Sequence, residues 1–331
     1  DQMRIERLKD DRQARFCWDE FVSDSNNGTV FHKQQFLGYH SEDRFEDHHL
    51  AVYKRNRLYA VITGVIVEDR NEKAFVSHPG SSYGGVVLAD HCRFEDAAAV
   101  ITALVTYMRE TDAGIIDLTL PPAPYYQVPH QTLEYALVSA GFQYRKRELT
   151  SVVAIDAAAP DSLYARLPKK TRADVRQAQK LGLGVNWIDD PSDDELSVMY
   201  DMLLENRQEL GLLTPPAHTI EELGRIRERL PGMLLMGLVR SDDQPVASTL
   251  VFRCNTRVLL TFYICHKSGA RNRHPVHLML HGLLCEGAKQ GYRYVDFGIS
   301  TVQMKPLYSL IKFKESFGAQ GFFRDTFEKH I

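Results

Sequence analysis

The sequence lacks the patterns by which several common classes of protein are recognised. Its 331 residues hold only five cysteines, and none of them forms a C-x-x-C pair, which argues against a disulfide framework or a cysteine-ligated zinc site. No apolar run approaches the ~20 residues that a transmembrane helix needs. The first residues do not place an apolar segment after a basic one, as a secretory signal would. These absences predict a cytoplasmic protein whose thiols are reduced.

Several catalytic motifs are missing as well. The chain has no phosphate-binding P-loop, no G-x-S-x-G nucleophile elbow and no dinucleotide-binding glycine fingerprint. Gly182-x-Gly184 follows an expected helix and precedes an expected strand, which reverses the dinucleotide order, so we interpret it as a turn. The net charge of −3 argues against a general nucleic-acid binder, although it allows a local basic patch.

The sequence contains the same order of elements twice. In each half we expect a helix, a glycine, a strand, a second helix ending at a glycine, and a last strand. The glycines are Gly114 and Gly141 in the first half, and Gly291 and Gly318 in the second, with equal spacing within each pair. A glycine after the last apolar position of a helix is typical of a left-handed C-cap. The repetition predicts two copies of one supersecondary unit.

An antiparallel meander precedes this pattern in each half. Its expected strands are Leu50–Tyr53, Leu58–Val67 and Ala74–Ser77, and then Leu234–Arg240, Val246–Arg253 and Arg257–Cys265. We therefore predict an α/β (α+β) fold of two tandem domains, each a mixed, mainly antiparallel sheet flanked by helices. The predicted domains are 1–156 and 157–331, joined at Ala157–Pro160, and each has the ~150 residues of an ordinary domain.

This element order resembles that of the N-acetyltransferase (GNAT) superfold, present twice. Three segments narrow the resemblance to the FemABX-type peptidyltransferases and their GNAT relatives. They are Tyr292–Gly298 with Phe313–Gly318, the K-x-R-like helix Lys169–Ala178, and the loop Ser77–Gly85. The resemblance implies acyl or aminoacyl transfer to an amine, an active site in the second domain, and a last strand, 321–329, that completes the first domain.

Two features depart from the relatives. The long charged helical hairpin that tRNA-docking FemABX enzymes often insert is missing. The turn Lys267–Pro275, which matches the coenzyme A loop of GNAT enzymes, has no glycine after Gly269, and Pro275 removes one of the amides that would hold phosphate. The donor therefore stays open between acyl-CoA and aminoacyl-tRNA, neither of them a tightly bound cofactor.

Cations near this turn are candidates for binding the phosphates of the donor or acceptor. Arg271 and Arg273 precede a helix N-terminus, where an anion is favoured. Lys312, Phe313 and Lys314 lie on the last helix, and the resemblance implies that Phe313 and Lys314 approach the donor's 3′-terminal ribose; the alternative is a solvated amphipathic helix with Phe313 buried. Further candidates form a basic stripe at helical spacing, or else a solvated helix face: Lys170, Arg172 and Arg176.

Candidates for proton transfer are Asp296, which follows the Gly291 cap, and His274, which adjoins the turn. Asp296 is equally explained as a carboxylate that caps neighbouring backbone. Tyr263 is expected to contact substrate along an open strand, and Tyr83 to lie where glycines let backbone approach a ligand. The resemblance implies Lys314 as a third catalytic candidate.

We expect no metal site. His277 and His281 have the i, i+4 spacing of a zinc-binding helix, but the glutamate of H-E-x-x-H is missing. The predicted function is transfer of an acyl or aminoacyl group to an amine of a cell-envelope precursor, polysaccharide or metabolite in a bacterial cytoplasm. Partners are this small-molecule acceptor and, for one donor, the acceptor end of tRNA. The alternative is a non-catalytic GNAT pair that only binds a ligand.

Overall fold

The structure is a computed structural model that describes residues 3–41, 43–155, 160–212 and 214–331. The chain divides into two compact units. Unit 1 comprises Asp1–Glu148 with Phe323–Ile331, and unit 2 comprises Leu149–Phe322. The predicted boundary at 156/157 and most of the predicted linker lie outside the described residues.

Unit 1 contains two sheets and a long helix. One sheet has the order β1-β3-β4-β7, and the other contains β17-β8-β6-β5-β2. Its elements are β1 (Arg4–Arg7), α1 (Arg12–Asp24), η1 (Val30–His32), α2 (Gln34–Leu37), β2 (Glu46–Asp47), β3 (Leu50–Lys54), β4 (Arg57–Thr63), β5 (Val65–Asp69), β6 (Glu72–Val76), β7 (Gly85–Leu88), α3 (Phe94–Glu110), β8 (Ile115–Thr119), η2 (Ala123–Tyr125), α4 (Thr132–Ser139), the first half of β9 (Gln143–Ala154) and most of β17 (Gln320–His330).

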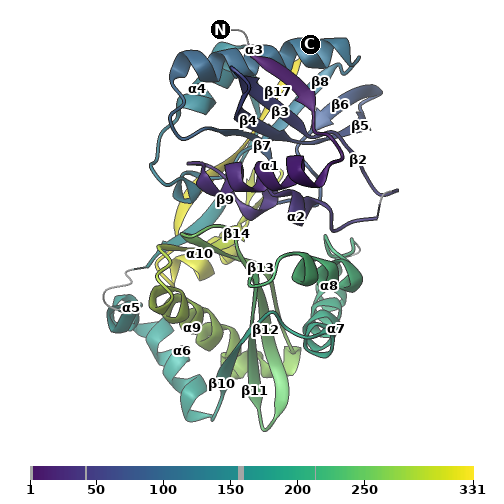
Figure 1. Cartoon of the computed structure of the whole chain (residues 1–331). Helices are drawn as coiled ribbons and strands as arrows, with labels where there is room; N and C mark the ends of the chain where they lie inside the picture. Colours follow the sequence, from purple (N-terminus) through teal and green to yellow (C-terminus); the bar gives the residue numbers. More distant parts are fainter. Residues whose placement is uncertain (1–2, 42, 156–159, 213) are drawn as a thin grey trace. The chain divides into compact units, whose positions relative to one another are not determined.

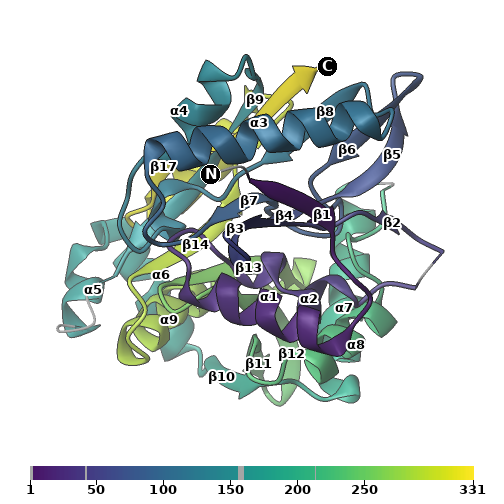
Figure 2. The same ribbon diagram turned by 45° about the horizontal axis from the view of Figure 1, so that its top comes forward.

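Helix α3 shows why these residues form a helix over a sheet. Its buried side chains recur at three- and four-residue intervals, from Ala97 to Met108, and they join the core of the unit. Acidic residues occupy its first turn and Arg109 its last, which suits the helix dipole. Figure 2 shows this helix lying across the strands of unit 1.

Two predicted details of unit 1 are wrong. The single strand expected over Leu58–Val67 is two strands, β4 and β5, that separate at Gly64. A Cβ there would lie 2.3 Å from the ring of Phe75, so only glycine fits. The left-handed residue after α3 is Asp112, with φ 60°, rather than Gly114. Gly141, Gly291 and Gly318 do adopt the left-handed conformation, with φ of 85°, 85° and 89°.

The main sheet of unit 2 has the order β10-β11-β12-β13-β14-β9 and helices on both faces, and β15 and β16 form a separate two-stranded sheet. Figure 1 shows α6 and α9 on one side of its strands and α7 and α8 on the other. Its elements are α5 (Pro160–Arg166), α6 (Lys169–Lys180), β10 (Gly184–Asp189), α7 (Asp193–Glu209), α8 (Ile220–Arg229), β11 (Leu234–Ser241), β12 (Gln244–Arg253), β13 (Val258–His266), η3 (Ser268–Arg273), α9 (Pro275–Lys289), β14 (Tyr294–Ile299), β15 (Thr301–Val302), β16 (Lys305–Pro306) and α10 (Tyr308–Glu315).

The predicted architecture, mainly antiparallel sheets flanked by helices, is confirmed. In unit 2 every neighbouring pair of strands is antiparallel except β13 and β14, which run parallel. None of the described helices is long and apolar enough to cross a membrane.

Gly237 on β11 packs closely against the side chain of Trp187 in unit 2, and a substitution can test this packing. It lies opposite Trp187 on β10, and a Cβ at Gly237 would lie 2.6 Å from that indole ring. We expect Gly237→Ala to destabilise unit 2 by about 1–3 kcal/mol, because the ring must leave its packed position. Trp187 fluorescence during urea unfolding measures this. Gly184→Ala is the matched control, since a Cβ there meets nothing within 4 Å; equal losses in the two variants would contradict the packing argument.

Candidate functional site

The predicted site in the second domain centres on the point where β13 and β14 part. The two strands pair only from Val258 to Leu260, opposite Tyr294 to Asp296. Beyond these residues β13 continues to His266 and β14 to Ile299, and none of their described residues pair with each other. Strands that part in this way leave backbone N–H and C=O groups along the edge of β13 free of their strand partner.

Asp296 shapes β14 at this point. Its side chain is fully buried, and its Oδ1 accepts hydrogen bonds from the Thr150 hydroxyl at 2.6 Å and from the Gly298 N–H at 2.8 Å. The pairing of β14 with β9 is irregular between Asp296 and Ile299, and Gly298 has φ 78°. The carboxylate therefore holds a β-bulge, a feature that is common beside active sites.

Lys314 of α10 holds the same bulge from the other side. Its ammonium donates to the carbonyl oxygens of Gly298 at 2.9 Å and Ile299 at 3.0 Å. Burial lowers the pKa of Lys314 to about 8, although the charge of Asp296 opposes this shift. The structure thus brings Asp296 and Lys314 together as positioning residues. Direct contact of either with a substrate stays a prediction.

The two arginines of the turn that follows β13 differ in exposure. Arg271 in η3 is exposed, whereas Arg273 donates a hydrogen bond to the Ser241 hydroxyl at 2.6 Å. His274 ends this turn in the left-handed conformation, with φ 56° and ψ 41°, and is the N-cap of α9 without a side-chain capping bond. Pro275 occupies the first turn of α9, as predicted. The start of α9 therefore offers few amides to a phosphate.

Phe313 and Lys312, both predicted site residues on α10, have different environments: the ring is packed and the lysine is exposed. Phe313 packs edge-on against His277, with ring centroids 5.1 Å apart, and against Phe317 at 5.3 Å. It is thus part of the apolar packing of unit 2. Lys312 is exposed. Lys312 therefore presents its charge to solvent, whereas Phe313 belongs to the packed interior.

Two predicted tyrosines are buried. The hydroxyl oxygen of Tyr263 accepts a hydrogen bond from the backbone N–H of His218 at 3.1 Å, and burial raises the pKa of this phenol. Tyr83 is only 2% exposed, and its hydroxyl donates to that of Tyr125 at 3.3 Å within unit 1. Their side chains serve local packing, so a substrate contact through either stays a prediction.

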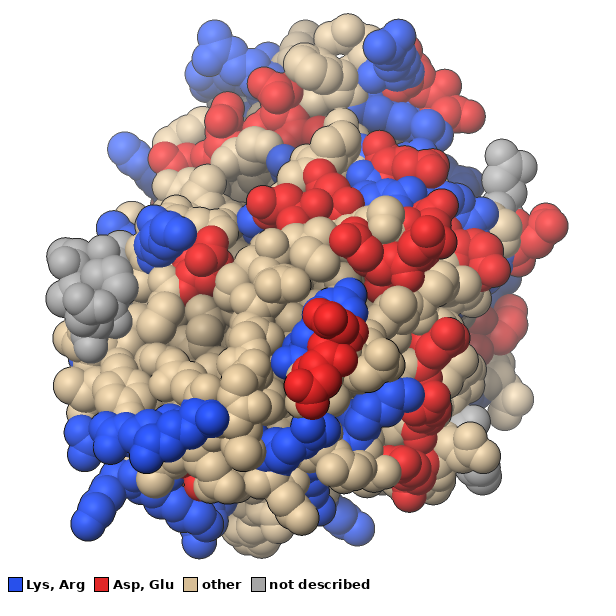
Figure 3. Space-filling view, turned by 90° about the horizontal axis from the view of Figure 1, so that it is seen from below, with Lys and Arg blue, Asp and Glu red and all other residues tan. Residues whose placement is uncertain are grey.

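The basic stripe predicted on α6 is a solvated surface. Lys170 and Arg176 are exposed, and Arg172 is half-buried. On the opposite face Thr171, Val175 and Ala178 are buried. Figure 3 shows lysine and arginine side chains gathered at the lower left of the face that it draws. Such a surface suits phosphate-rich ligands.

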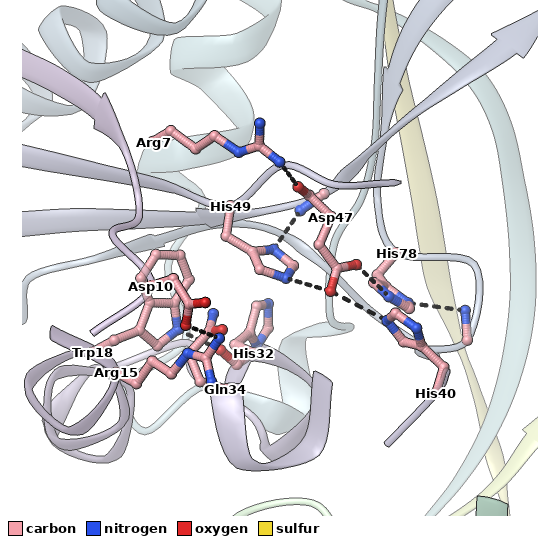
Figure 4. Close-up of polar contacts among 12 residues, drawn as sticks. Arg7, Asp10, Arg15, Trp18, His32, Gln34, His40, Asp47, His49 and His78 are labelled. Carbon is pink, nitrogen blue, oxygen red and sulfur yellow. Dashed lines mark hydrogen bonds and ion pairs between the residues drawn. The ribbon is translucent and has the colours of Figure 1, made fainter. Parts of the chain in front are cut away.

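Sequence reasoning missed a polar cluster in unit 1 built on Asp47 (Figure 4). His40 and His78 place Nε2 3.2 Å from its carboxylate oxygens, and His49 places Nε2 at 3.7 Å. Hydrogen bonds from His40 and His78, together with the nearby His49 ring, hold the pKa of Asp47 far below its usual range, although burial opposes this. No sequence motif signals the cluster, because its residues come from separate strands and loops.

The protonation of His40 predicts that the stability of unit 1 depends on pH. Burial would lower the pKa of His40, but its hydrogen bond to Asp47 raises it above the ordinary value. A raised folded-state pKa contributes stability below the ordinary histidine pKa of about 6.5, and that contribution is lost as pH rises through the folded value. We therefore expect unit 1 to lose stability from about pH 6.5 upward, and His40→Gln to remove this decline. Urea unfolding followed by Trp18 fluorescence tests this, with Trp187 in unit 2 replaced by Phe.

Two parting parallel strands inside an otherwise antiparallel sheet, with helices on both faces, define the GNAT class of fold. Residues 166–305 match the family described as Acetyltransferase (GNAT) domain. No curated protein sequence matches the chain.

Solved structures resemble the whole chain rather than one unit. FemX is 14% identical with a TM-score of 0.74, over 98% of this chain and 97% of that one. A tandem GNAT protein from the clavulanic acid biosynthesis pathway is 11% identical with a TM-score of 0.56, over 99% and 98%. L-PGS from Bacillus licheniformis is 11% identical with a TM-score of 0.59, over 96% and 91%. The predicted tandem GNAT-like fold is confirmed, and the second domain contains the match to the GNAT acetyltransferase family.

Proposed function

We propose that this protein transfers an acyl or aminoacyl group from an activated donor to an amine, at the opening between β13 and β14. The observation that carries the proposal is the three-residue pairing of these strands. An extended donor chain with amide groups can bond to the edge of β13 as an added strand. Backbone N–H groups on that edge can then stabilise the oxygen of the acyl carbonyl as charge develops on it.

The reaction needs an amine nucleophile and a place for its proton. The amine nitrogen bonds to the acyl carbon, and the bond from that carbon to the leaving sulfur or oxygen breaks. The proton lost by the amine ends on the leaving group or on a nearby base. His274 is the candidate base, because its ring is partly exposed and lies beside the turn after β13. Asp296 and Lys314 support the reaction by holding the bulge of β14.

Two donor classes are supported by different observations. The match of residues 166–305 to a GNAT acetyltransferase domain favours an acyl-CoA. The exposed basic surface of α6, with Lys170 and Arg176, favours the alternative donor, an aminoacyl-tRNA. The acceptor we propose is a small-molecule amine, such as a cell-envelope precursor, a polysaccharide or a metabolite.

Calorimetric titration with acetyl-CoA, with CoA and with a charged tRNA distinguishes these donors. We expect saturable binding of one class at sub-millimolar concentration. Arg271→Ala should weaken binding of a CoA donor, whereas Lys170→Ala with Arg176→Ala should weaken binding of a tRNA donor. Arg273→Ala is the control, because Arg273 is engaged by Ser241. Binding of neither class would contradict the proposal and favour a pair that binds some other ligand without catalysis.

A further inference from the structure

A carboxylate and two imidazoles meet at the interface of α6 and α9 in unit 2. Nε2 of His274 lies 3.7 Å from Oδ1 of Asp174, and Nε2 of His277 lies 3.6 Å from Oδ2. All three ligand atoms lie within 4.8 Å of one another. The side chains are only partly exposed, at 15% for Asp174, 24% for His274 and 23% for His277.

Hydrogen bonds do not account for the positions of Asp174, His274 and His277. Among the residues that the structure describes, the Asp174 carboxylate accepts no hydrogen bond, and neither ring of His274 or His277 takes part in one. The two ion-pair distances are too long for hydrogen bonds. A poorly solvated carboxylate without donors costs free energy unless something offsets its charge.

The helix pattern also singles out Asp174. On α6 the buried residues are Thr171, Val175 and Ala178, which mark the face packed inward. Asp174 lies at the edge of this face in the helical repeat and is half-buried. His274 is the N-cap of α9 and His277 lies in its first turn, with their ring centroids 5.2 Å apart. Two helices thus each place ligand-type side chains at their contact.

We propose that Asp174, His274 and His277 form a site for one divalent first-row transition-metal ion such as Zn²⁺. While the ion is bound, the Nε2 lone pair of His274 is occupied, so the proton of the amine then ends on the leaving group rather than on this ring. Imidazole and carboxylate are ligands that these ions prefer. Ligand bonds of ~2.0–2.1 Å place the ligand atoms of a tetrahedral ion roughly 3.4 Å apart. The two imidazoles lie 3.6 and 3.7 Å from different oxygens of Asp174, and the three ligand atoms lie within 4.8 Å of one another, so binding requires the side chains to move closer together. Three protein ligands leave one coordination position open for water or a substrate oxygen. The set differs from the His277 and His281 pair, since His281 instead lies 3.7 Å from the Cys285 sulfur.

The left-handed conformation of His274 is consistent with a role for its side chain. A residue other than glycine is strained at φ 56°, and such strain concentrates at functional positions. His274→Gly would relieve the strain while removing the ligand, so it separates metal binding from folding.

The cluster on Asp47 in unit 1 contains similar residues but suits a metal poorly (Figure 4). Nδ1 of His78 accepts the Gly80 N–H, and Nδ1 of His49 accepts the Gly64 N–H. The proton of each neutral ring is therefore on Nε2, the atom that faces Asp47. A metal-ligating histidine has the opposite arrangement, with its other nitrogen donating. His78 therefore donates to Asp47 and offers no lone pair to an ion there. Of these three described rings, only that of His40, whose Nδ1 faces the Ser41 carbonyl oxygen at 2.7 Å, has the arrangement of a metal ligand.

Metal titration of the chelator-treated full-length protein tests the proposal. We expect one equivalent of Zn²⁺ to bind and to raise the melting temperature, and Co²⁺ to give the visible absorption of a tetrahedral site. Asp174→Asn and His274→Gly should each weaken binding by more than roughly 100-fold, because losing a ligand costs more than losing an outer-shell partner.

His281→Gln and His78→Gln are the matched controls, and both should bind as the wild type does. Absence of saturable binding would overturn the proposal. So would unchanged binding in a folded Asp174→Asn or His274→Gly variant, or loss of binding in His78→Gln. Circular dichroism of each variant establishes that it is folded before titration.

Discussion

Asp296→Ala is expected to destabilise unit 2 by about 3–5 kcal/mol, the range seen when one member of a buried charged cluster is removed. The fully buried carboxylate accepts hydrogen bonds from Thr150 and Gly298, and its charge favours the Lys314 ammonium. Without it, the buried Thr150 hydroxyl loses its acceptor at about 1–3 kcal/mol, and the partly buried Gly298 N–H loses its acceptor as well. Urea unfolding followed by Trp187 fluorescence, with Trp18 replaced by Phe, measures the shift in midpoint at constant m.

Two further variants separate the contributions to this effect. Thr150→Val removes a single hydrogen bond to Asp296, so we expect a loss of about 1 kcal/mol. Asp296→Asn keeps an acceptor oxygen and removes only the charge, so its loss should lie between the other two. A loss below about 1 kcal/mol in Asp296→Ala would show that this carboxylate does not hold the bulge.

Lys314→Met is expected to change the pH dependence of the free energy of unfolding of unit 2. The folded-state pKa of about 8 lies below the ordinary value of 10.5, so the unfolded chain binds more protons between these values. The contribution of Lys314 to stability therefore rises with pH across that window. At 1.36 kcal/mol per pKa unit, the difference between wild type and variant should change by about 2–3 kcal/mol between pH 7 and pH 10.

The same variant tests the positioning role of Lys314. Methionine keeps most of the side-chain volume but gives no hydrogen bond to the carbonyl groups of Gly298 and Ile299. A shift of the bulge by ~1 Å would lower turnover roughly 100-fold, with the fold intact. Lys312→Met, on the exposed side of α10, is the matched control and should leave the pH dependence unchanged. A pH-independent difference between wild type and Lys314→Met would contradict the lowered pKa.

Local sequence patterns predict most of the fold because hydrophobic periodicity and glycine positions act over a few residues. They predict that the last helix and strand end near Gly318 and Glu328, and the structure has α10 over Tyr308–Glu315 and β17 over Gln320–His330. The errors come from contacts between distant residues. The break at Gly64 depends on the Phe75 ring, which no pattern around Gly64 reveals.

The sequence predicts which residues belong to the candidate site better than it predicts the contacts that these residues make. Asp296 and Lys314 are both predicted site residues, and the structure brings them to one bulge. The sequence does not show that the Lys314 ammonium faces backbone carbonyls, because this depends on how α10 packs. It does not single out Asp174 as a ligand either, because His274 and His277 lie on another helix far along the chain.

The position of β17 at the end of the chain has a consequence for folding during synthesis. Strand β17 pairs with β8 of unit 1, yet it follows all of unit 2 in the chain. During translation, unit 2 can therefore close while unit 1 still lacks a strand of its sheet and exposes the edge of β8. Premature termination just before β17 would release a protein in which unit 1, the unit synthesised first, lacks a strand. Chaperones would therefore be needed most by the N-terminal part of the nascent chain.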